Sequence, residues 1–438
     1  MKGLRILFAL ETYPPEISGL GKAVQRLANG LVSRGYKVGV VCPGTKLTME
    51  VTQENGVTVF RLGSLPLMLH KGFRFAPLAG SFMDTVFDEF KPDVVHLEDH
   101  FSTGLAALTE SEWRDIPAVG TNHFHPDNLL HYLKAKKGSN NYRMLVQVLW
   151  RSFRFVYRQL AVVTTPTQTA ADILKENGFN HPVRAVSNGI DLSLYKRTAS
   201  EEAAKRRQAP GHVWQLVTVG RVEQEKRFDV LIKMVSFLPK ELPLQLVIVG
   251  KGQHKPVLEK LVGDLTLGQK VKFAGALSDE ELRELYANSD ILVTASEVEL
   301  QGLTIMEGMA YGLPVVATKA MAIPELVHEG VNGWLFAPGD AAGAAEKVKQ
   351  IINDSRMYER FSQQALVLIA KHDFQRTLDA YEEIYQQARQ LGSGMRKKTW
   401  KWRLVEWTVH YQSQLIVSVI GGLIIVLLAA IYLISLFI

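Results

Sequence analysis

Residues 290–318 read DILVTASEVELQGLTIMEGMAYGLPVVAT and predict a strand, a loop, a helix and a second strand. The apolar run in DILVTAS is typical of a buried strand, and the apolar spacing in LTIMEGMAYG is typical of a helix. Gly312 and Pro314 end the helix before a second apolar run at 315–317. Two buried strands joined through a helix indicate a parallel sheet.

The same alternation of apolar runs and amphipathic helical patterns extends through most of the chain, which predicts parallel sheets covered by helices. Strands of a first sheet are expected at 5–10, 37–42, 57–61, 94–97, 118–122 and 161–164. Strands of a second sheet are expected at 215–219, 246–249, 271–273, 291–294 and 315–317. The polar, charged stretch 196–212 separates the two series and is the predicted linker.

We therefore expect an α/β fold class with two Rossmann-like doubly wound domains, at 1–195 and 213–372, joined by the linker. Ligands of such sheets bind at the carboxyl ends of the strands, so the expected ligand site is a central cleft that both domains face. The helical pattern at 373–391 could extend the second domain or cross back to the first. The sequence leaves both possibilities open.

The C-terminal end of the chain predicts a membrane anchor. Residues 415–438 contain no charge across 24 residues, and a helix of that length would measure about 36 Å against a hydrocarbon core of about 30 Å. The preceding segment, 392–414, is basic and aromatic, which favours the cytoplasmic headgroup layer. We expect a single-pass transmembrane helix in the cell membrane with the folded body on the cytoplasmic side; the alternative is a buried core helix.

Positive charge is concentrated in two segments, 129–160 and 395–403, of a chain whose net charge is +6. A nucleic-acid binder usually spreads its positive charge over the folded body, so this pattern favours an anionic membrane surface as partner and no nucleic acid. If 142–160 is a helix, its arginines share a face that suits a lipid surface, although the helix could instead pack on its own domain with a solvated basic edge. The candidate membrane-surface residues are Lys134, Lys136, Lys137, Arg143, Arg151, Arg154 and Arg158.

Two loops at predicted strand ends could bind a phosphorylated ligand. Gly19 and Gly21 open a helix after the first strand and could bring backbone amides close to a ligand, or they could form a structural turn. Arg221 and Lys226 follow the first strand of the second domain, where two cations suit a diphosphate. A solvated charge cluster is the alternative for these two.

The loop and helix at 299–307 carry two carboxylates, Glu299 and Glu307, that can both face the expected cleft. Between them, the backbone amides of Gln301, Gly302 and Leu303 lie at a helix amino terminus, which suits a phosphate. The carboxylates could accept hydrogen bonds from hydroxyl groups on either side of that phosphate. The alternative is a capping carboxylate and a helix-surface carboxylate.

Several motifs together resemble the retaining glycosyltransferases of family 4, which have the two-domain GT-B fold. The likeness covers most of residues 1–390, and its motifs are specific as a set although each is weak alone. They are GRVEQEK, ELQGLTIMEGMAYGLPVVAT, AIPELVHEGVNGWLF, the glycine loop at 18–21, PDVVH, GTNH and SNGID. The resemblance implies an acceptor-side first domain and a second domain that binds a nucleotide sugar.

The resemblance also implies roles for individual residues. Arg221 and Lys226 would hold the donor diphosphate, and Glu307 would bind the ribose hydroxyls. Glu299 would contact the transferred sugar beside its reacting carbon, and His123 would lie near the sugar and the acceptor. Gly19 and Gly21 would close over the phosphates. For His123 alone, a hydrogen-bonded structural histidine at a strand end is the alternative.

One departure from the family pattern bears on the acceptor. Many members have Gly-Phe-Gly after the first glutamate, whereas this chain has Leu300-Gln301-Gly302, a variant that resembles the diacylglycerol alpha-glycosyltransferase branch. We expect a retaining hexosyltransferase that uses a UDP-linked sugar and a lipid acceptor such as diacylglycerol. A polyprenyl-linked saccharide as acceptor and a catalytically silent nucleotide-sugar-binding scaffold are the alternatives. No cofactor and no metal are expected, since the chain contains no D-x-D motif.

Overall fold

The computed structural model describes residues 3–16, 18–66, 74–130, 138–195, 207, 209, 211–392 and 400–410. The chain divides into two compact units, each built on its own sheet. Unit 1 comprises Met1–Thr164, Asn177–Arg184 and Ala380–Ile438, and unit 2 comprises Thr165–Glu176 and Ala185–Asp379.

In the described residues, the main sheet of unit 1 has the strand order β10-β9-β8-β7-β1-β2-β4-β3. Strands β9, β8, β7, β1, β2 and β4 run parallel, and β3 pairs antiparallel with β4. The bounds are β1 Arg5–Ala9, β2 Lys37–Pro43, β3 Glu50–Glu54, β4 Val57–Leu62, β7 Val94–Leu97, β8 Ala118–Thr121, β9 Val162–Thr165 and β10 Val183–Ala185; β5 (Leu65–Pro66) and β6 (Arg74–Phe75) form a separate antiparallel pair.

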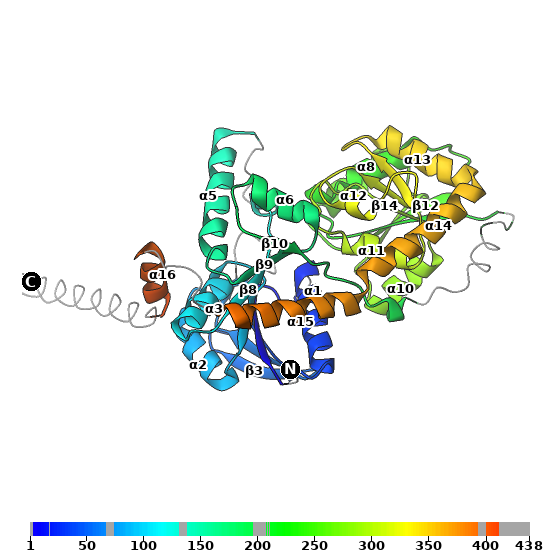
Figure 1. The fold of residues 1–438 in the computed structure, drawn as a ribbon. Helices are drawn as coiled ribbons and strands as arrows, with labels where there is room; N and C mark the ends of the chain where they lie inside the picture. The colour runs from blue at the N-terminus through cyan, green and yellow to red at the C-terminus, as the bar shows by residue number, and fades with distance from the viewer. Residues whose placement is uncertain are drawn as a thin grey trace, which may run out of the picture. The chain divides into compact units, whose positions relative to one another are not determined.

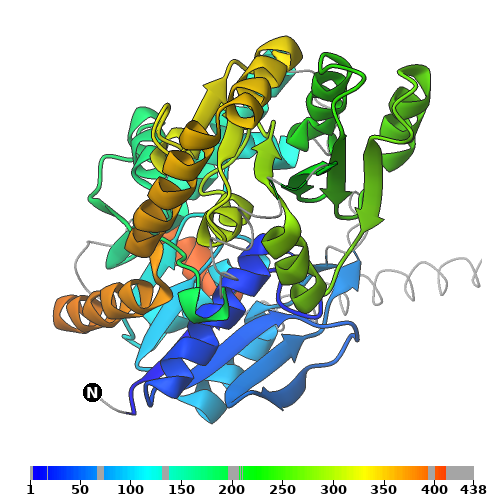
Figure 2. The ribbon, with the colours of Figure 1, turned by 90° about the vertical axis from the view of Figure 1, so that its right-hand side faces the viewer.

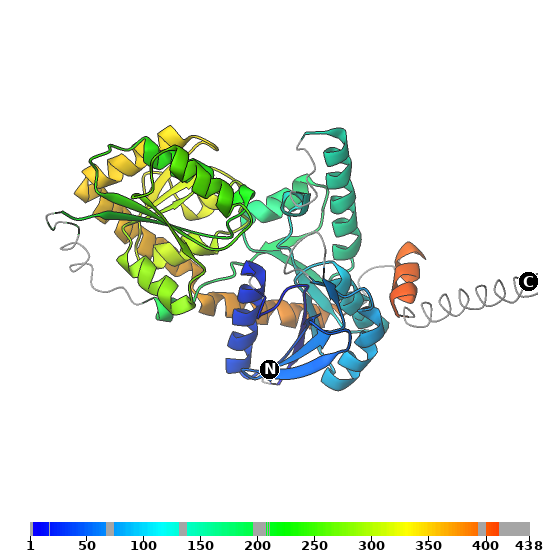
Figure 3. The same ribbon diagram turned by 180° about the vertical axis from the view of Figure 1, so that it is seen from behind.

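The helices of unit 1 cover this sheet and extend beyond it. Figure 2 shows α1 lying along the strands, and Figures 1 and 3 show α5 reaching past the edge of the sheet. The bounds are α1 Gly19–Ser33, α2 Gly80–Phe90, α3 Ser102–Trp113, α4 Pro126–Leu130, α5 Asn140–Tyr157, α15 Phe374–Leu391 and α16 Trp400–His410. The last part of α15 belongs to unit 1, because its residues from Ala380 onward group with that unit.

Trp402 packs helix α16 against unit 1. Trp402 is 0% exposed, its indole Nε1 donates a hydrogen bond to the Glu112 carboxylate of α3, and its ring lies 5.3 Å from that of Phe155. A buried tryptophan needs a partner for its N–H as well as apolar contacts, and both are present here.

Unit 2 is built on a sheet with the strand order β13-β12-β11-β14-β15-β16 in the described residues, parallel throughout. The strand bounds are β11 Trp214–Val219, β12 Leu244–Val249, β13 Val271–Gly275, β14 Ile291–Thr294, β15 Val315–Thr318 and β16 Gly333–Phe336. The helix bounds are α6 Gln168–Glu176, η1 Leu192–Leu194, η2 Gln224–Lys226, α8 Phe228–Ser236, α9 Lys255–Asp264, α10 Asp279–Asn288, α11 Leu303–Ala310, α12 Ile323–Leu326, α13 Ala341–Asn353, α14 Ser355–Ile369 and η3 Ala370–His372.

The strands of unit 2 are apolar at almost every position because both faces of the sheet are buried. Leu216 packs into one core with α8 and α13, whereas its neighbour Val217 packs into the opposite core with α11. Alternate residues of a strand point to opposite faces, so two covered faces require continuous apolar runs. This is the physical reason why the strands were visible in the sequence.

The predicted transmembrane helix is contradicted by the described chain. None of the helices described is both long enough and apolar enough to cross a bilayer. The segment for which the span was predicted, 415–438, lies outside the described residues. The single-pass anchor, and the cell-membrane location that we based on it, are therefore not retained.

Candidate functional site

Two cations predicted to bind a diphosphate lie just after β11 in unit 2. Lys226, in η2, places its Nζ 2.7 Å from Oε2 of Glu299, and Arg221 donates to Oε1 of Glu225 over 3.0 Å. The side chains of Lys226 and Glu299 are about one-fifth exposed. The fold thus brings Lys226 and Glu299 together, although they are 73 positions apart in sequence.

The loop between β14 and α11 ends in a glycine that starts the helix. Gly302 is the residue before α11 and has a φ of 82°, in the left-handed region that glycine adopts without strain. Leu303 is the first helical residue, so the predicted position of its amide at the helix amino terminus is correct.

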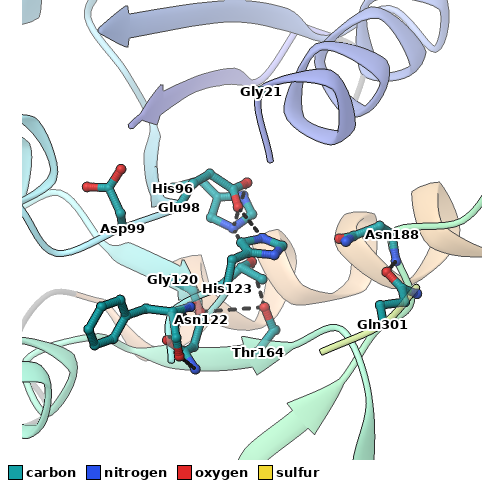
Figure 4. A network of polar contacts seen from close by, with 12 residues as sticks. Gly21, His96, Glu98, Asp99, Gly120, Asn122, His123, Thr164, Asn188 and Gln301 are labelled. Carbon is teal, nitrogen blue, oxygen red and sulfur yellow. Dashed lines mark hydrogen bonds and ion pairs between the residues drawn. The ribbon is translucent and has the colours of Figure 1, made fainter. Parts of the chain in front are cut away.

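Gln301 binds its own unit through its side chain. It is 4% exposed; its Oε1 accepts from the Asn188 amide over 3.2 Å, and its Nε2 donates to Ser187 Oγ over 2.6 Å. The side chain therefore joins this loop to the 187–188 turn, as Figure 4 shows for Asn188. Sequence reasoning named Gln301 but missed this contact, since its partners are over a hundred positions away.

Glu307 lies on α11 and accepts a hydrogen bond from a buried tyrosine. Tyr286 of α10 places its hydroxyl 3.1 Å from Oε2 of Glu307. Burial raises the pKa of Tyr286 well above its usual value, and the negative charge of Glu307 adds to the shift. The phenol therefore keeps its proton and orients the Glu307 carboxylate.

In unit 1, the candidate His123 follows β8 and meets a carboxylate that follows β7. His123 Nε2 lies 2.9 Å from Oε2 of Glu98, whose side chain is 2% exposed against 15% for His123. Figure 4 shows this pair at the strand ends with His96 beside it. Sequence reasoning did not single out Glu98. The run HLEDH, which starts on β7 and continues past its end, is the signal that could have found it.

Two further carboxyl groups lie buried at the same edge of the unit 1 sheet. Asp99 Oδ2 accepts from the Glu11 amide over 2.6 Å, and Glu11 Oε1 accepts from Ser102 Oγ and the Thr103 amide. Burial raises the pKa of both carboxyls, and the charge of Glu11 raises that of Asp99 further. The protonated, neutral forms of the Glu11 and Asp99 carboxyl groups are therefore favoured.

His100 lies next to this pair and is neutral at ordinary pH. It packs among aromatic rings, with Phe101 stacked at 4.6 Å and Phe153 edge-on at 5.8 Å. Burial lowers the pKa of His100 to about 4. This edge of unit 1 thus combines buried acids and histidines that carry little net charge.

The two candidate glycines of α1 differ in what surrounds them. Ser18 caps the helix by accepting from the Gly21 amide over 2.8 Å. A Cβ at Gly21 would lie 2.9 Å from both Ser18 Oγ and the Thr12 carbonyl oxygen, whereas a Cβ at Gly19 would meet nothing within 4 Å. Only Gly21 is required by close approach.

Helix α5 and the residue that caps its carboxyl end, Arg158, carry the predicted membrane-surface arginines, and the structure separates them. Arg143, Arg151 and Arg158 are exposed, whereas Arg154 is half-buried and donates to the Asn177 carbonyl of its own unit. Met144 and Val148 on the same helix are 58% and 55% exposed. Lys134, Lys136 and Lys137 lie outside the described residues.

Known glycosyltransferases are similar in sequence to most of this chain. The model for Glycosyltransferase Family 4 matches residues 17–194, and the model for glycosyl transferases group 1 matches residues 199–366. An alpha-monoglucosyldiacylglycerol synthase of Streptococcus pneumoniae is 25% identical over 378 residues, covering 85% of this chain and 83% of that protein. A sulfoquinovosyl transferase of Arabidopsis thaliana is 27% identical over 313 residues, covering 69% and 58%.

Solved structures show the same fold. Sucrose-phosphate synthase from Thermosynechococcus elongatus superposes with a TM-score of 0.75 at 18% identity, over 88% of this chain and 98% of that one. The Anabaena protein HepE, solved in complex with UDP-glucose, gives a TM-score of 0.69 at 21% identity, over 87% and 99%. The fold is therefore GT-B, and the two matched models together span most of the sequence: the chain belongs to glycosyltransferase family 4.

Proposed function

We propose that this protein transfers a hexose from a UDP-linked sugar to a membrane lipid such as diacylglycerol, with retention of the anomeric configuration. The observation that carries the proposal is the group formed by Lys226, Glu299 and the start of α11 at the carboxyl edge of the unit 2 sheet. Relatives named for diacylglycerol support the lipid acceptor, and the neighbour that holds UDP-glucose supports the donor.

The residues of unit 2 suit the departure of a nucleoside diphosphate. Negative charge develops on a phosphate oxygen as the bond to the sugar breaks, and fixed cations and helix amides stabilise it. We assign that role to Arg221, Lys226 and the Leu303 amide. Donor binding would exchange the Lys226–Glu299 contact for contacts to phosphate, which frees the Glu299 carboxylate for the transferred sugar.

The remaining donor contact is assigned to Glu307. Its carboxylate is oriented by the protonated Tyr286 hydroxyl, and an oriented carboxylate can accept hydrogen bonds from both hydroxyls of a ribose. On the acceptor side, we assign His123 to a substrate hydroxyl. These assignments require no metal, because the protein itself supplies the positive charge.

The surface of α5 supports contact with an anionic lipid layer. Met144 and Val148 are exposed apolar side chains, and Arg143 and Arg151 are exposed cations on the same helix. A helix that combines apolar side chains and arginines binds the interface of an acidic membrane. We propose that this helix brings the protein to the layer that contains its acceptor.

Transfer assays test the proposal. The full chain, given diacylglycerol in vesicles and UDP-glucose, UDP-galactose or GDP-mannose in turn, should form a monohexosyl lipid from a UDP sugar, detected by mass spectrometry. Excess EDTA should leave the rate unchanged. Transfer to soluble sugars alone, or loss with EDTA that a divalent ion restores, would contradict the proposal.

Two variants make the test specific. Lys226→Ala should weaken UDP binding about tenfold to a hundredfold, measured by calorimetry, because it removes a charge-assisted contact. Lys233→Ala, which removes a cation paired with Asp229 on α8, is the matched control. Met144→Glu with Val148→Glu should slow transfer in vesicles without changing UDP binding, whereas Val367→Glu, at a position 60% exposed in unit 2, should change neither.

A further inference from the structure

The loop that carries His123 is held at both of its ends. The Asn122 amide donates to the Thr164 carbonyl over 2.8 Å. The Asn122 side chain then bonds the backbone of Phe124 twice, at 3.1 Å each, as donor and as acceptor. The backbone on either side of His123 is thus fixed, and the orientation of its ring depends on what the ring nitrogens bind.

One ring nitrogen of His123 is committed to Glu98. Nε2 lies 2.9 Å from Glu98 Oε2, and a carboxylate only accepts hydrogen bonds. Nε2 therefore carries the proton, and in the neutral imidazole Nδ1 is left with a lone pair. In the part of the chain that the structure describes, no residue bonds this Nδ1. The pair leaves one acceptor atom available to a ligand.

Glu98 is held in turn by a buried polar network. Its Oε1 lies 3.5 Å from His96 Nε2, and the same Nε2 lies 2.7 Å from Thr121 Oγ1. His96 Nδ1 lies 2.9 Å from the Tyr385 hydroxyl on α15, and Thr121 Oγ1 lies 3.0 Å from the Tyr381 hydroxyl. Figure 4 shows the His96 end of this network beneath Glu98.

The members of the network that can titrate are neutral. Burial lowers the pKa of His96 and raises the pKa of both Tyr381 and Tyr385. Tyr385 can then donate to His96 Nδ1, which leaves the His96 Nε2 proton to face Thr121 and Glu98. The network thus presents the neutral His96 Nε2–H donor to Oε1 of Glu98, and His123 binds the other carboxylate oxygen.

We propose that Glu98 is a positioning residue that holds His123 in the Nε2–H tautomer and directs Nδ1, as a hydrogen-bond acceptor, at a substrate hydroxyl. The inference rests on the proposed function for the identity of that hydroxyl, but the tautomer can be measured without any substrate. A carboxylate enforces this tautomer because it cannot donate. An amide in its place can donate to Nε2 and so permits the opposite one.

Nitrogen NMR of the full chain labelled with ¹⁵N-histidine tests the tautomer directly. His123→Gln identifies the resonances. In the unsubstituted protein, Nε2 of His123 should show the shift of a protonated nitrogen and Nδ1 that of an unprotonated one. Glu98→Gln should reverse or mix these shifts. Glu112→Gln changes another buried carboxylate of unit 1, bonded to Trp402, and should leave them unchanged.

Kinetics separate positioning from folding. Glu98→Gln should lower kcat about tenfold to a hundredfold, in line with the loss of a group that orients a functional histidine, while the melting temperature and UDP binding stay near those of the parent. Comparing the KM for donor and for acceptor shows which hydroxyl Nδ1 contacts. If Glu98→Gln leaves the His123 tautomer unchanged, the inference fails even where transfer persists. If the parent transfers no sugar, the proposed function fails and the tautomer result stands alone.

Discussion

The carboxyl edges of the two sheets differ in how they handle charge. In unit 2, ion pairs are partly exposed: Lys226 with Glu299, Arg221 with Glu225, and Arg227 with Glu297. In unit 1, the corresponding edge buries acids and histidines whose pKa values shift toward the neutral forms. Both edges lie at the carboxyl ends of parallel strands in similar sheets. The fold therefore does not dictate the charge at this edge.

This difference suits the division of chemical work that we propose for the two units. Partly exposed ion pairs can exchange partners when a charged ligand arrives, because water screens the charges during the exchange. Buried neutral groups cannot follow a charge, but they can hold a hydrogen-bonding atom in one orientation. Unit 2 is thus suited to a departing diphosphate, and unit 1 to a hydroxyl.

The largest effect should come from Glu299→Gln at the charged edge. We expect kcat to fall on the order of a hundredfold with donor at saturation, because the variant removes the charge that we propose acts at the reacting sugar. Glu297→Gln, which removes the neighbouring carboxylate paired with Arg227, is the control and should keep most activity. Equal losses in both variants would show that any charge in this loop serves.

Buried His100, at the carboxyl edge of the unit 1 sheet, should make the stability of the protein depend on pH. The pKa of His100 is about 4 in the folded state against 6.5 as its ordinary value, so between these values the unfolded chain binds the proton more readily. The contribution of His100 to stability is therefore fully present above about pH 6.5 and is lost toward pH 4, by about 3 kcal/mol. Urea unfolding from pH 7 to pH 4.5 measures the slope.

His100→Phe supplies the control for that measurement. Phenylalanine keeps an aromatic ring among the surrounding aromatic rings and does not titrate, so the variant should lose less stability over the same pH range. The slope is the quantity to compare, since overpacking shifts the stability equally at every pH. An unchanged slope would mean that His100 is not the group that makes this edge sensitive to acid.

A smaller effect on the free energy of unfolding should distinguish alanine variants at the two glycines of α1. Gly21→Ala should lower the free energy of unfolding by about 1–3 kcal/mol, because its Cβ would press on the Thr12 carbonyl and on Ser18. Gly19→Ala, with open space around its Cβ, should leave stability unchanged or slightly higher. Denaturant unfolding of both variants tests the pair. Similar losses would show that the close approach at Gly21 is relieved by movement.

The apolar strands of both sheets could be read from sequence because burial on two faces leaves a continuous signal. The expected strands at 5–10 and 291–294 correspond to β1 and β14 within one residue. Strand β3, Glu50–Glu54, was missed because it is an edge strand whose residues are half-buried or exposed. A polar edge strand has no apolar period to detect.

The sequence was enough to predict several residues of the candidate site. It was not enough to predict which of them form ion pairs and hydrogen bonds with one another. Arg221, Lys226 and Glu299 stood out because charges follow buried strands there, but the ion pair of Lys226 with Glu299 depends on the neighbouring positions of β11 and β14 in the sheet. The network at His96 reaches Tyr385, 289 positions away. Arg154 shows the converse, since its spacing suggested an outward face and its guanidinium bonds Asn177.

The burial of Trp402 sets a limit on how the chain can be shortened. A protein that stops at Leu391 keeps every described strand, yet it would open a hole the size of an indole on α3, beside Phe155. The Glu112 carboxylate would lose the hydrogen bond that the Trp402 indole donates to it. A shortened protein meant for crystals or calorimetry should therefore end beyond His410, with α16 left in place.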